Sequence, residues 1–204
     1  MDSKEHWEEV YRSKAPDAVS WYRPHLETSL RLISESAPDR SAAIIDVGGG
    51  ESTLVDDLLQ YGYRNLTVLD LSAVALDTTK RRLGANAEQI TWVASDILMV
   101  DLPAHHYDVW HDRAVFHFLS EASERAAYIR VLTNALKPGG HVVIGTFGPG
   151  GPNRCSGLDV RRYDAQQLSN EFGAGFELVT STIEDHHTPA GSAQQFLYCC
   201  FRKQ

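Results

Sequence analysis

The alternation of short apolar runs with helix-like segments between residues 42 and 147 is the feature that most constrains the fold. The first run, Ala43–Val47, is compact and leads into three consecutive glycines, which is typical of a buried strand. Further apolar runs follow at residues 66–69, 90–94, 107–111 and 141–147, and helical patterns cover residues 52–61, 72–83 and 120–136. Strands that alternate with helices predict βαβ units, and therefore a parallel sheet with helices on both faces.

The rhythm changes after Phe147. The segment 148–157 is rich in Gly and Pro, which predicts a loop, and a short helix is expected at 164–172. Two apolar runs, 176–183 and 194–201, then follow without a long helix between them. They pair most simply as an antiparallel hairpin beside the parallel strands of a mixed α/β sheet. Within the regular part, Ser120 is expected to cap the helix that follows it, and the segment Lys137–Gly140 is expected to form a turn.

Residues 1–40 have a different pattern, with two short helical segments around a turn at Pro16 and Pro24. The run Trp21-Tyr22-Arg23-Pro24 is an exposed-looking aromatic cluster in this segment, which also contains Trp7. We hypothesise that it forms a lid over a cofactor and an acceptor; the alternative is that its helices only pack on the sheet. The chain is therefore expected to be one domain, with a cap at 1–40 and a cofactor-binding part at 41–204.

Composition restricts the class of protein. A hydrophobic fraction of 43% with 23% charged residues excludes a disordered or fibrous chain, and a formal net charge of −8 disfavours nucleic acid as a partner. No signal peptide is visible and no run reaches about 18 apolar residues, so no membrane partner is expected. The three cysteines, Cys155, Cys199 and Cys200, make no disulfide framework, which suits the cytoplasm. We expect a cytoplasmic monomer or homodimer.

The glycine turn after the first strand is the sharpest indication of a ligand. Gly48, Gly49 and Gly50 let a ligand approach the backbone, and the helix that follows offers free N–H groups. The dinucleotide pattern G-x-G-x-x-G is broken by Thr53, and the charge of Asp46 disfavours a pyrophosphate but favours an ammonium group. The turn therefore indicates a cofactor with an amine, such as S-adenosylmethionine, unless it has only a structural role.

Two more acids end the next two strands. Asp70 comes 22 residues after Gly48, where an acid accepts hydrogen bonds from ribose hydroxyls. Asp96 follows the third strand, where it is expected to accept a bond from an adenine amino group, with Leu71 and Ile97 as apolar faces for the ring. Each acid alone has the alternative role of a loop or capping residue, but three at successive strand ends favour a common site.

Five segments in order resemble the motifs of class I S-adenosylmethionine-dependent methyltransferases. They lie at residues 46–52, 68–72, 95–97, 107–114 and 136–141, with Ser52 in place of the usual last glycine of the first motif. The resemblance covers roughly residues 40 to 201. It implies a Rossmann-like α/β fold whose seven-stranded sheet has the order 3-2-1-4-5-7-6 with strand seven antiparallel, S-adenosylmethionine as cofactor, and methyl transfer as the activity.

The turn, the acids and the resemblance together give a set of expected cofactor-binding residues. These are Asp46, Gly48, Gly49, Gly50, Ser52, Asp70, Leu71, Ser72, Asp96, Ile97, His111 and Trp21. Candidate catalytic residues around the acceptor are Asp112, His117, Tyr163 and His187. For Asp112 the alternative is a contact with the cofactor's methionine end, for His117 it is packing, and for His187 it is a solvated turn. No local pair has ligand spacing, so no metal is expected, and Cys155 is expected to be a buried thiol.

Methyl transfer requires alignment of the acceptor more than acid–base chemistry, because the cofactor carries the reactive group. We expect a small-molecule acceptor, because few residues remain outside the cofactor-binding sheet to grip a macromolecule. A protein-lysine methyltransferase, which the sequence also resembles, is the second choice. A non-catalytic cofactor-binding module is the third, and a dinucleotide reductase the weakest. The acceptor atom (oxygen, nitrogen, sulfur or a metalloid) stays open.

Overall fold

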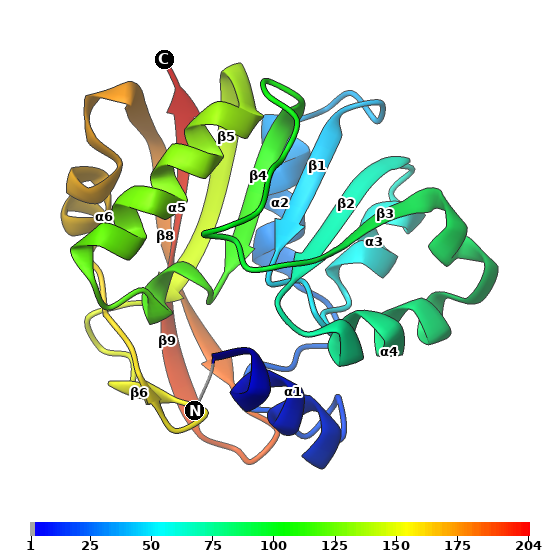
Figure 1. Ribbon diagram of the computed structural model, residues 1–204. Coiled ribbons are helices and arrows are strands. Elements are labelled where there is room, and N and C mark those ends of the chain that lie inside the picture. Colours follow the sequence, from blue (N-terminus) through cyan, green and yellow to red (C-terminus); the bar gives the residue numbers. More distant parts are fainter. Residues whose placement is uncertain (1–2) are drawn as a thin grey trace.

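The structure, a computed structural model, describes residues 3–204 (Figure 1). Its helices are α1 (Ser3–Ser13), α2 (Glu27–Ser36), α3 (Leu54–Gln60), α4 (Ala73–Leu83), α5 (Ala122–Ala135) and α6 (Ala165–Phe172). Its strands are β1 (Ala43–Val47), β2 (Asn65–Asp70), β3 (Ile90–Ala94), β4 (Tyr107–Arg113), β5 (Leu136–Phe147), β6 (Arg154–Cys155), β7 (Leu158–Asp159), β8 (Phe176–His187) and β9 (Ala193–Lys203). None of the helices described is long and apolar enough to cross a membrane.

One seven-stranded sheet organises the molecule, in the order β3-β2-β1-β4-β5-β9-β8. Strands β1 to β5 pair in parallel, and β9 pairs antiparallel with both β5 and β8. Because β6 and β7 form a separate ribbon, β8 and β9 are the sixth and seventh strands of the sheet. The expected order 3-2-1-4-5-7-6 and the antiparallel terminal hairpin are therefore confirmed.

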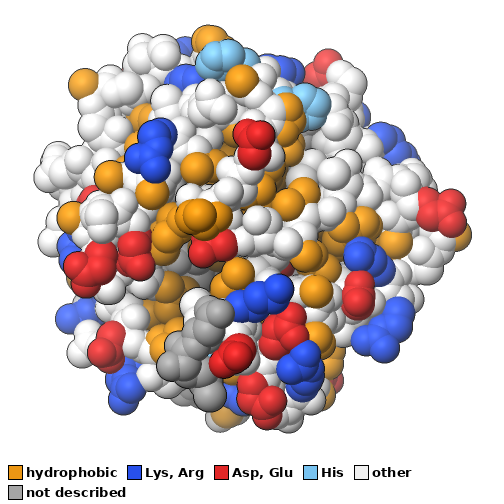
Figure 2. Space-filling view, in the orientation of Figure 1, with side chains coloured by type: hydrophobic (Ala, Val, Ile, Leu, Met, Phe, Trp, Pro, Cys, Tyr) orange, Lys and Arg blue, Asp and Glu red, His pale blue; other side chains and the backbone are white. Residues whose placement is uncertain are grey.

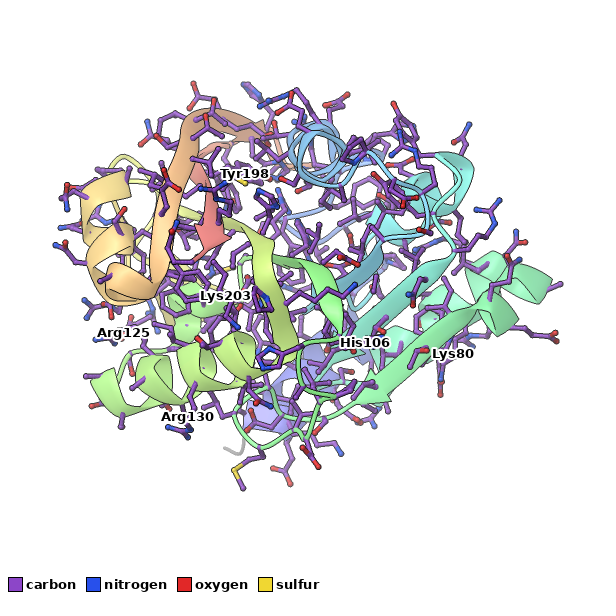
Figure 3. The ribbon with its side chains drawn as sticks, turned by 90° about the horizontal axis from the view of Figure 1, so that it is seen from above. Lys80, His106, Arg125, Arg130, Tyr198 and Lys203 are labelled. Carbon is purple, nitrogen blue, oxygen red and sulfur yellow. The ribbon has the colours of Figure 1, made fainter. Side chains whose placement is uncertain are left out.

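Two apolar layers cover the sheet, and successive residues of a strand contribute to opposite layers. Ile44 packs into the layer that contains α2 and α3, whereas its neighbour Ile45 packs into the layer of α5 and α6. Figure 3 shows α2 and α5 on opposite sides of the sheet. In β9 the same alternation places Cys200 in the first layer and Cys199 in the second, so both free thiols are core residues, as expected.

One local expectation is wrong, and another is met inside the bounds of a strand. Helix α5 begins after Glu121 rather than Ser120, because Glu121 and Glu124 form a reciprocal capping box at its start. The segment 137–140, expected to form a turn, lies within the bounds of β5, but none of its residues has a partner in the register with β4 or β9. The register between β4 and β5 shifts after Tyr107, and the positive φ of 75° at Gly139 accommodates the irregularity.

The N-terminal segment divides into two parts with different positions. Helix α2 packs on the sheet through buried Leu30 and Ile33 and contacts β4 and β5, so it belongs to a covering layer rather than to a cap. Helix α1 has no buried residue and lies beneath the carboxyl ends of the parallel strands (Figure 1). In the same orientation, Figure 2 shows charged side chains of both signs over the region of α1, with hydrophobic side chains gathered directly above.

Candidate cofactor and acceptor site

The turn that follows β1 depends on glycine at two positions. Gly48 has a φ of 71°, and a Cβ there would lie 2.0 Å from Val115 Cγ2. A Cβ on Gly49 would lie 2.6 Å from Val68 Cγ1 and 2.7 Å from Asp46 Oδ2. Any side chain at Gly48 or Gly49 would collide with these neighbours. Glycine therefore lets the backbone of the turn lie close to the Asp46 carboxylate and leaves the space above it open to a ligand.

Asp46 is held by a buried chain of hydrogen bonds that joins three elements. Its Oδ1 lies 2.6 Å from His111 Nδ1 on β4, and His111 Nε2 lies 2.9 Å from Ser29 Oγ on α2. Asp46, His111 and Ser29 are all buried. Asp46 Oδ2 is also buried and has no hydrogen-bond partner among the described residues. An unpaired buried carboxylate oxygen is costly, so a cationic donor from a ligand is the partner that this atom lacks.

Asp70 closes the end of β2 and organises the next turn. Its Oδ1 accepts a hydrogen bond of 2.8 Å from Ser72 N, and Ser72 Oγ in turn accepts one of 3.2 Å from Ala75 N at the start of α4. Burial raises the pKa of Asp70 to about 7, and the charges of Asp46 and Glu51 add to the rise. A compact group of acids therefore surrounds the glycine turn, which favours ligands with hydroxyl and ammonium donors.

Two adjoining cavities open at this edge of the sheet. The larger, of about 230 Å³, runs past the ends of β1 to β5, and the smaller, of about 40 Å³, lies over the glycine turn. Of the expected cofactor-binding residues, Asp70, Leu71, Asp96 and Ile97 line the larger cavity; Asp46, Gly49, Ser52 and His111 line the smaller one; Gly48 and Trp21 line both. Gly50 and Ser72 line neither and support the turns below.

The lining fits S-adenosylmethionine in its donors and acceptors. The free Asp46 oxygen suits an ammonium group, and Asp70 suits a pair of ribose hydroxyls. Leu71 and Ile97 offer apolar surfaces for a flat ring, and the exposed Asp96, which lines the same cavity, offers an acceptor. These are the groups that the sequence predicted, brought to one edge of the sheet by parallel β1, β2 and β3.

The four expected catalytic residues lie outside both cavities, and Asp112 requires the first correction. It is fully buried on the α5 side of β4. Its oxygens accept hydrogen bonds of 2.8 Å from Val115 N, 3.1 Å from Phe116 N and 2.6 Å from the Tyr128 hydroxyl. Burial raises the pKa of Asp112 to about 6. Its role is to organise the chain after β4 rather than to contact an acceptor.

His117 is a packing residue, which was the alternative interpretation of its position. It is fully buried, its ring centroid lies 4.6 Å from that of Phe118 and 4.7 Å from that of Phe147, and its Nδ1 accepts a bond from Phe147 N. Burial lowers the pKa of His117 to about 3. The imidazole is therefore neutral, and aromatic side chains separate it from the cavity that they line.

Tyr163 and His187 lie elsewhere in the molecule. Tyr163 is buried near α6, and its hydroxyl accepts a bond of 3.1 Å from Arg161 Nε. His187 is exposed at the end of β8, consistent with the alternative of a solvated turn.

Cys155 is buried as expected but lines the larger cavity. No group of three or more His, Cys, Asp or Glu side chains in the described part of the chain is arranged to hold a metal ion.

The end of the larger cavity away from Asp70 and Ile97 is lined mostly by residues other than those expected around an acceptor. They are aromatic and basic: Trp7, Arg113, Phe118, Phe147 and Phe196. Arg113 follows Asp112 directly, and the alternation of side chains along β4 puts the two on opposite faces. His111 and Arg113 are two residues apart on β4, so their side chains point to the same face of the sheet, which is the face of Asp46. The sequence pattern of β4 could therefore have identified Arg113 as a site residue.

Comparisons with known proteins agree with this geometry. The sequence profile of the family described as "Methyltransferase domain" matches residues 44–140. EEF1A lysine methyltransferase 2 of Danio rerio is 25% identical over 193 residues, which cover 88% of this chain and 77% of that protein.

Two solved structures share the fold. The 1,6-didemethyltoxoflavin-N1-methyltransferase of Burkholderia thailandensis, with 1,6-didemethyltoxoflavin and S-adenosylhomocysteine bound, has a TM-score of 0.71 at 22% identity, over 99% of this chain and 84% of that one. The N-methyltransferase NodS of Bradyrhizobium japonicum, in complex with S-adenosylhomocysteine, has a TM-score of 0.72 at 17% identity, over 99% of each chain. The profile match includes β1 to β4 and the glycine turn between β1 and α3. The chain is therefore similar to a methyltransferase domain over residues 44–140, and it shares its fold with two methyltransferases of known structure.

Proposed function

We propose that this protein transfers a methyl group from S-adenosylmethionine to a small-molecule acceptor bound in the aromatic part of the larger cavity. The observation that carries the proposal is the continuity of this cavity. Its lining passes from Asp70 and Ile97, at the ends of β2 and after β3, to Phe147 and Phe196 on β5 and β9. A cofactor and a flat or apolar acceptor therefore have adjoining places in one continuous cavity.

The cover over this space supports a small acceptor. Trp7 on α1 lies 5.1 Å from Phe118 and 5.9 Å from Trp21, measured between ring centroids, and Tyr11 lies 6.2 Å from Trp21. These edge-to-face contacts hold α1 across the carboxyl ends of the strands. Apart from α1 and the β6–β7 ribbon, the described elements belong to the sheet and its covering helices, which leaves little surface to grip a macromolecule.

The residues of the site have defined tasks in this reaction. When bound, S-adenosylmethionine supplies a methyl group activated by a sulfonium. Asp46 accepts hydrogen bonds from the ammonium group, and Asp70 accepts them from ribose hydroxyls in its ionised form. The aromatic walls orient the acceptor and exclude water, which is the main contribution that a protein makes to an in-line displacement.

A protein-lysine acceptor is the second candidate, since the relative from Danio rerio is named as an enzyme of that kind. Incubation of the protein with S-adenosylmethionine labelled in the methyl group and with cell lysate separates the two. Label in the low-mass fraction supports the small acceptor. Label in discrete protein bands overturns it in favour of the second candidate. Omission of the enzyme is the control for endogenous activity.

A further inference from the structure

We propose that the acceptor is a small planar anion, such as an aromatic carboxylate, phenolate or thiolate, and that Arg113 binds its negative charge. The inference rests on the proposed function, since it assigns the chemistry of the acceptor in the same cavity. Arg113 is the last residue of β4, it is half-buried, and it lines both cavities.

The guanidinium of Arg113 is fixed by two elements that are distant in sequence. Its Nε donates to the Tyr198 hydroxyl at 2.8 Å, and its Nη1 donates to the Trp21 backbone oxygen at 2.9 Å. Tyr198 is anchored in β9, on the α2 side of the sheet (Figure 3). A guanidinium that is held in this way loses little conformational freedom when it binds a ligand.

The charge of Arg113 has no counterion in the described part of the chain. No carboxylate lies within 4.0 Å of it, and its Nη2 is buried without a hydrogen-bond partner among the described residues. Arg23, another arginine at the smaller cavity, pairs with Glu27 at 2.9 Å. A buried cation with a free donor is costly when unpaired, and an anion in the cavity supplies both the charge and the acceptor.

The surroundings of the guanidinium favour a planar acceptor. Arg113 Cζ lies 4.5 Å from the centre of the Phe196 ring, and the Phe196 and Phe147 rings lie 4.9 Å apart in an edge-to-face arrangement. Both rings line the larger cavity and not the smaller one. Cys155 also lines the larger cavity. Burial raises the pKa of its thiol, and the positive charge of Arg113 lowers it, so this charge is felt inside the cavity.

The carboxylates of the larger cavity are already engaged in local structure. Asp70 accepts from Ser72 N, Asp96 accepts from Leu98 N, and Glu124 accepts from Glu121 N. With the expected bases His117 and His187 outside the cavity as well, an acceptor that arrives deprotonated agrees best with the site.

The reaction with such an acceptor balances without a base. The anionic atom of the acceptor forms a bond to the methyl carbon, and the bond between that carbon and the sulfonium sulfur breaks. The electron pair of the broken bond stays on sulfur, which becomes a neutral thioether. No proton is released, and Arg113 keeps the acceptor in its anionic form until the bond forms.

Calorimetric titration of the full chain, saturated with S-adenosylhomocysteine, tests the proposal with benzoate and its neutral isostere benzamide as probes. We expect the wild type to bind benzoate at least about 10-fold more tightly than benzamide, and Arg113→Gln to abolish that preference. Arg113→Lys is expected to retain part of it. The matched control is Arg154→Gln, which removes an exposed arginine of β6 that pairs with Asp159 and lines neither cavity.

Three results would overturn the proposal. These are equal or undetectable binding of the two probes by the wild type, a preference for benzoate that survives in Arg113→Gln, and a loss of S-adenosylhomocysteine affinity of about 10-fold or more in Arg113→Gln. The last result would assign Arg113 to the carboxylate of the cofactor. Failure of the wild type to bind S-adenosylhomocysteine at all is a different outcome, which contradicts the proposed function itself.

Discussion

Asp46 and His111 face each other across β1 and β4, with Asp46 Oδ1 and His111 Nδ1 only 2.6 Å apart in a buried setting. Ser29 completes the chain from the other side of the imidazole. The contact determines which carboxylate oxygen is left free above the glycine turn. His111 and Ser29 therefore hold in place the carboxylate whose free oxygen we propose as the partner of the ammonium group.

Replacement of His111 by Leu is expected to weaken both the fold and the cofactor site. The Asp46 carboxylate would then be buried without a partner, which costs about 3–5 kcal/mol in the free energy of unfolding. Affinity for S-adenosylhomocysteine is expected to fall about 10-fold, because the carboxylate is no longer held in place. Urea unfolding and calorimetry measure the two effects. His106→Leu, at an exposed histidine labelled in Figure 3, is the control, and equal affinity in both variants would contradict the positioning role.

Asp70→Asn is expected to change how stability depends on pH. Burial raises the pKa of Asp70 to about 7, so between about pH 4 and 7 the folded protein holds a proton that the unfolded chain has released. The contribution of Asp70 to the free energy of unfolding therefore falls as pH rises through this range, whereas the contribution of His117, whose pKa burial lowers to about 3, rises with pH. Asn at this position removes the Asp70 contribution, so the difference in slope between wild type and variant separates it from the contributions of Asp112, whose pKa is about 6, and of His117. Denaturant midpoints measured from pH 4 to 8 check this, and an unchanged slope in the variant would refute the burial argument.

Tyr128→Phe tests the structural role of Asp112. The Tyr128 hydroxyl donates to Asp112 at 2.6 Å and accepts a bond of 2.8 Å from Trp110 Nε1, in a fully buried group. Loss of the hydroxyl leaves both partners less well paired, and we expect a destabilisation of about 1–3 kcal/mol with little change in cofactor affinity. Thermal unfolding and calorimetry give the two values. A large loss of affinity without a loss of stability would instead restore a direct role for Asp112.

Trp7→Ala tests whether α1 acts as a lid. Helix α1 has no buried residue, so the variant is expected to keep its stability within about 1 kcal/mol. Its rings nevertheless contact Phe118 and Trp21 over the cavity, so dissociation of S-adenosylhomocysteine is expected to become about 10-fold faster. Stopped-flow fluorescence measures the rate, with the exposed Tyr61→Ala as control. Equal rates in both variants would mean that α1 only packs on the sheet.

Much of this fold follows from patterns in the sequence, and the reason is visible in particular elements. Asp46 lies near the end of β1, Asp70 ends β2, and Asp96 follows the end of β3. Parallel pairing of these strands must bring the three acids to one edge of the sheet. The hairpin of β8 and β9 likewise follows from two apolar runs with no helix between them. These features depend on local pattern and on the geometry of parallel sheets.

The acceptor side depends on packing that no local pattern encodes. The position of α1 comes from contacts of Trp7 with Phe118, more than 100 residues away in the chain. His117 was a plausible base by residue type, but its burial behind Phe147 follows from how the chain turns after β4. Two adjacent residues of β4 also take opposite faces: Asp112, which was expected in the site, faces α5, and Arg113 faces the cavity. Alternation along a strand shows that the two side chains point to opposite faces, but it does not show which face each one takes until one residue has been placed.

Calorimetric titration of S-adenosylhomocysteine into the purified chain tests the central claim most directly. The site described here predicts saturable binding of one ligand per chain, a rise in the unfolding temperature with ligand, and a strong loss of affinity in Asp46→Asn and Asp70→Asn. The absence of both binding heat and thermal stabilisation in the wild type would contradict the account of the site.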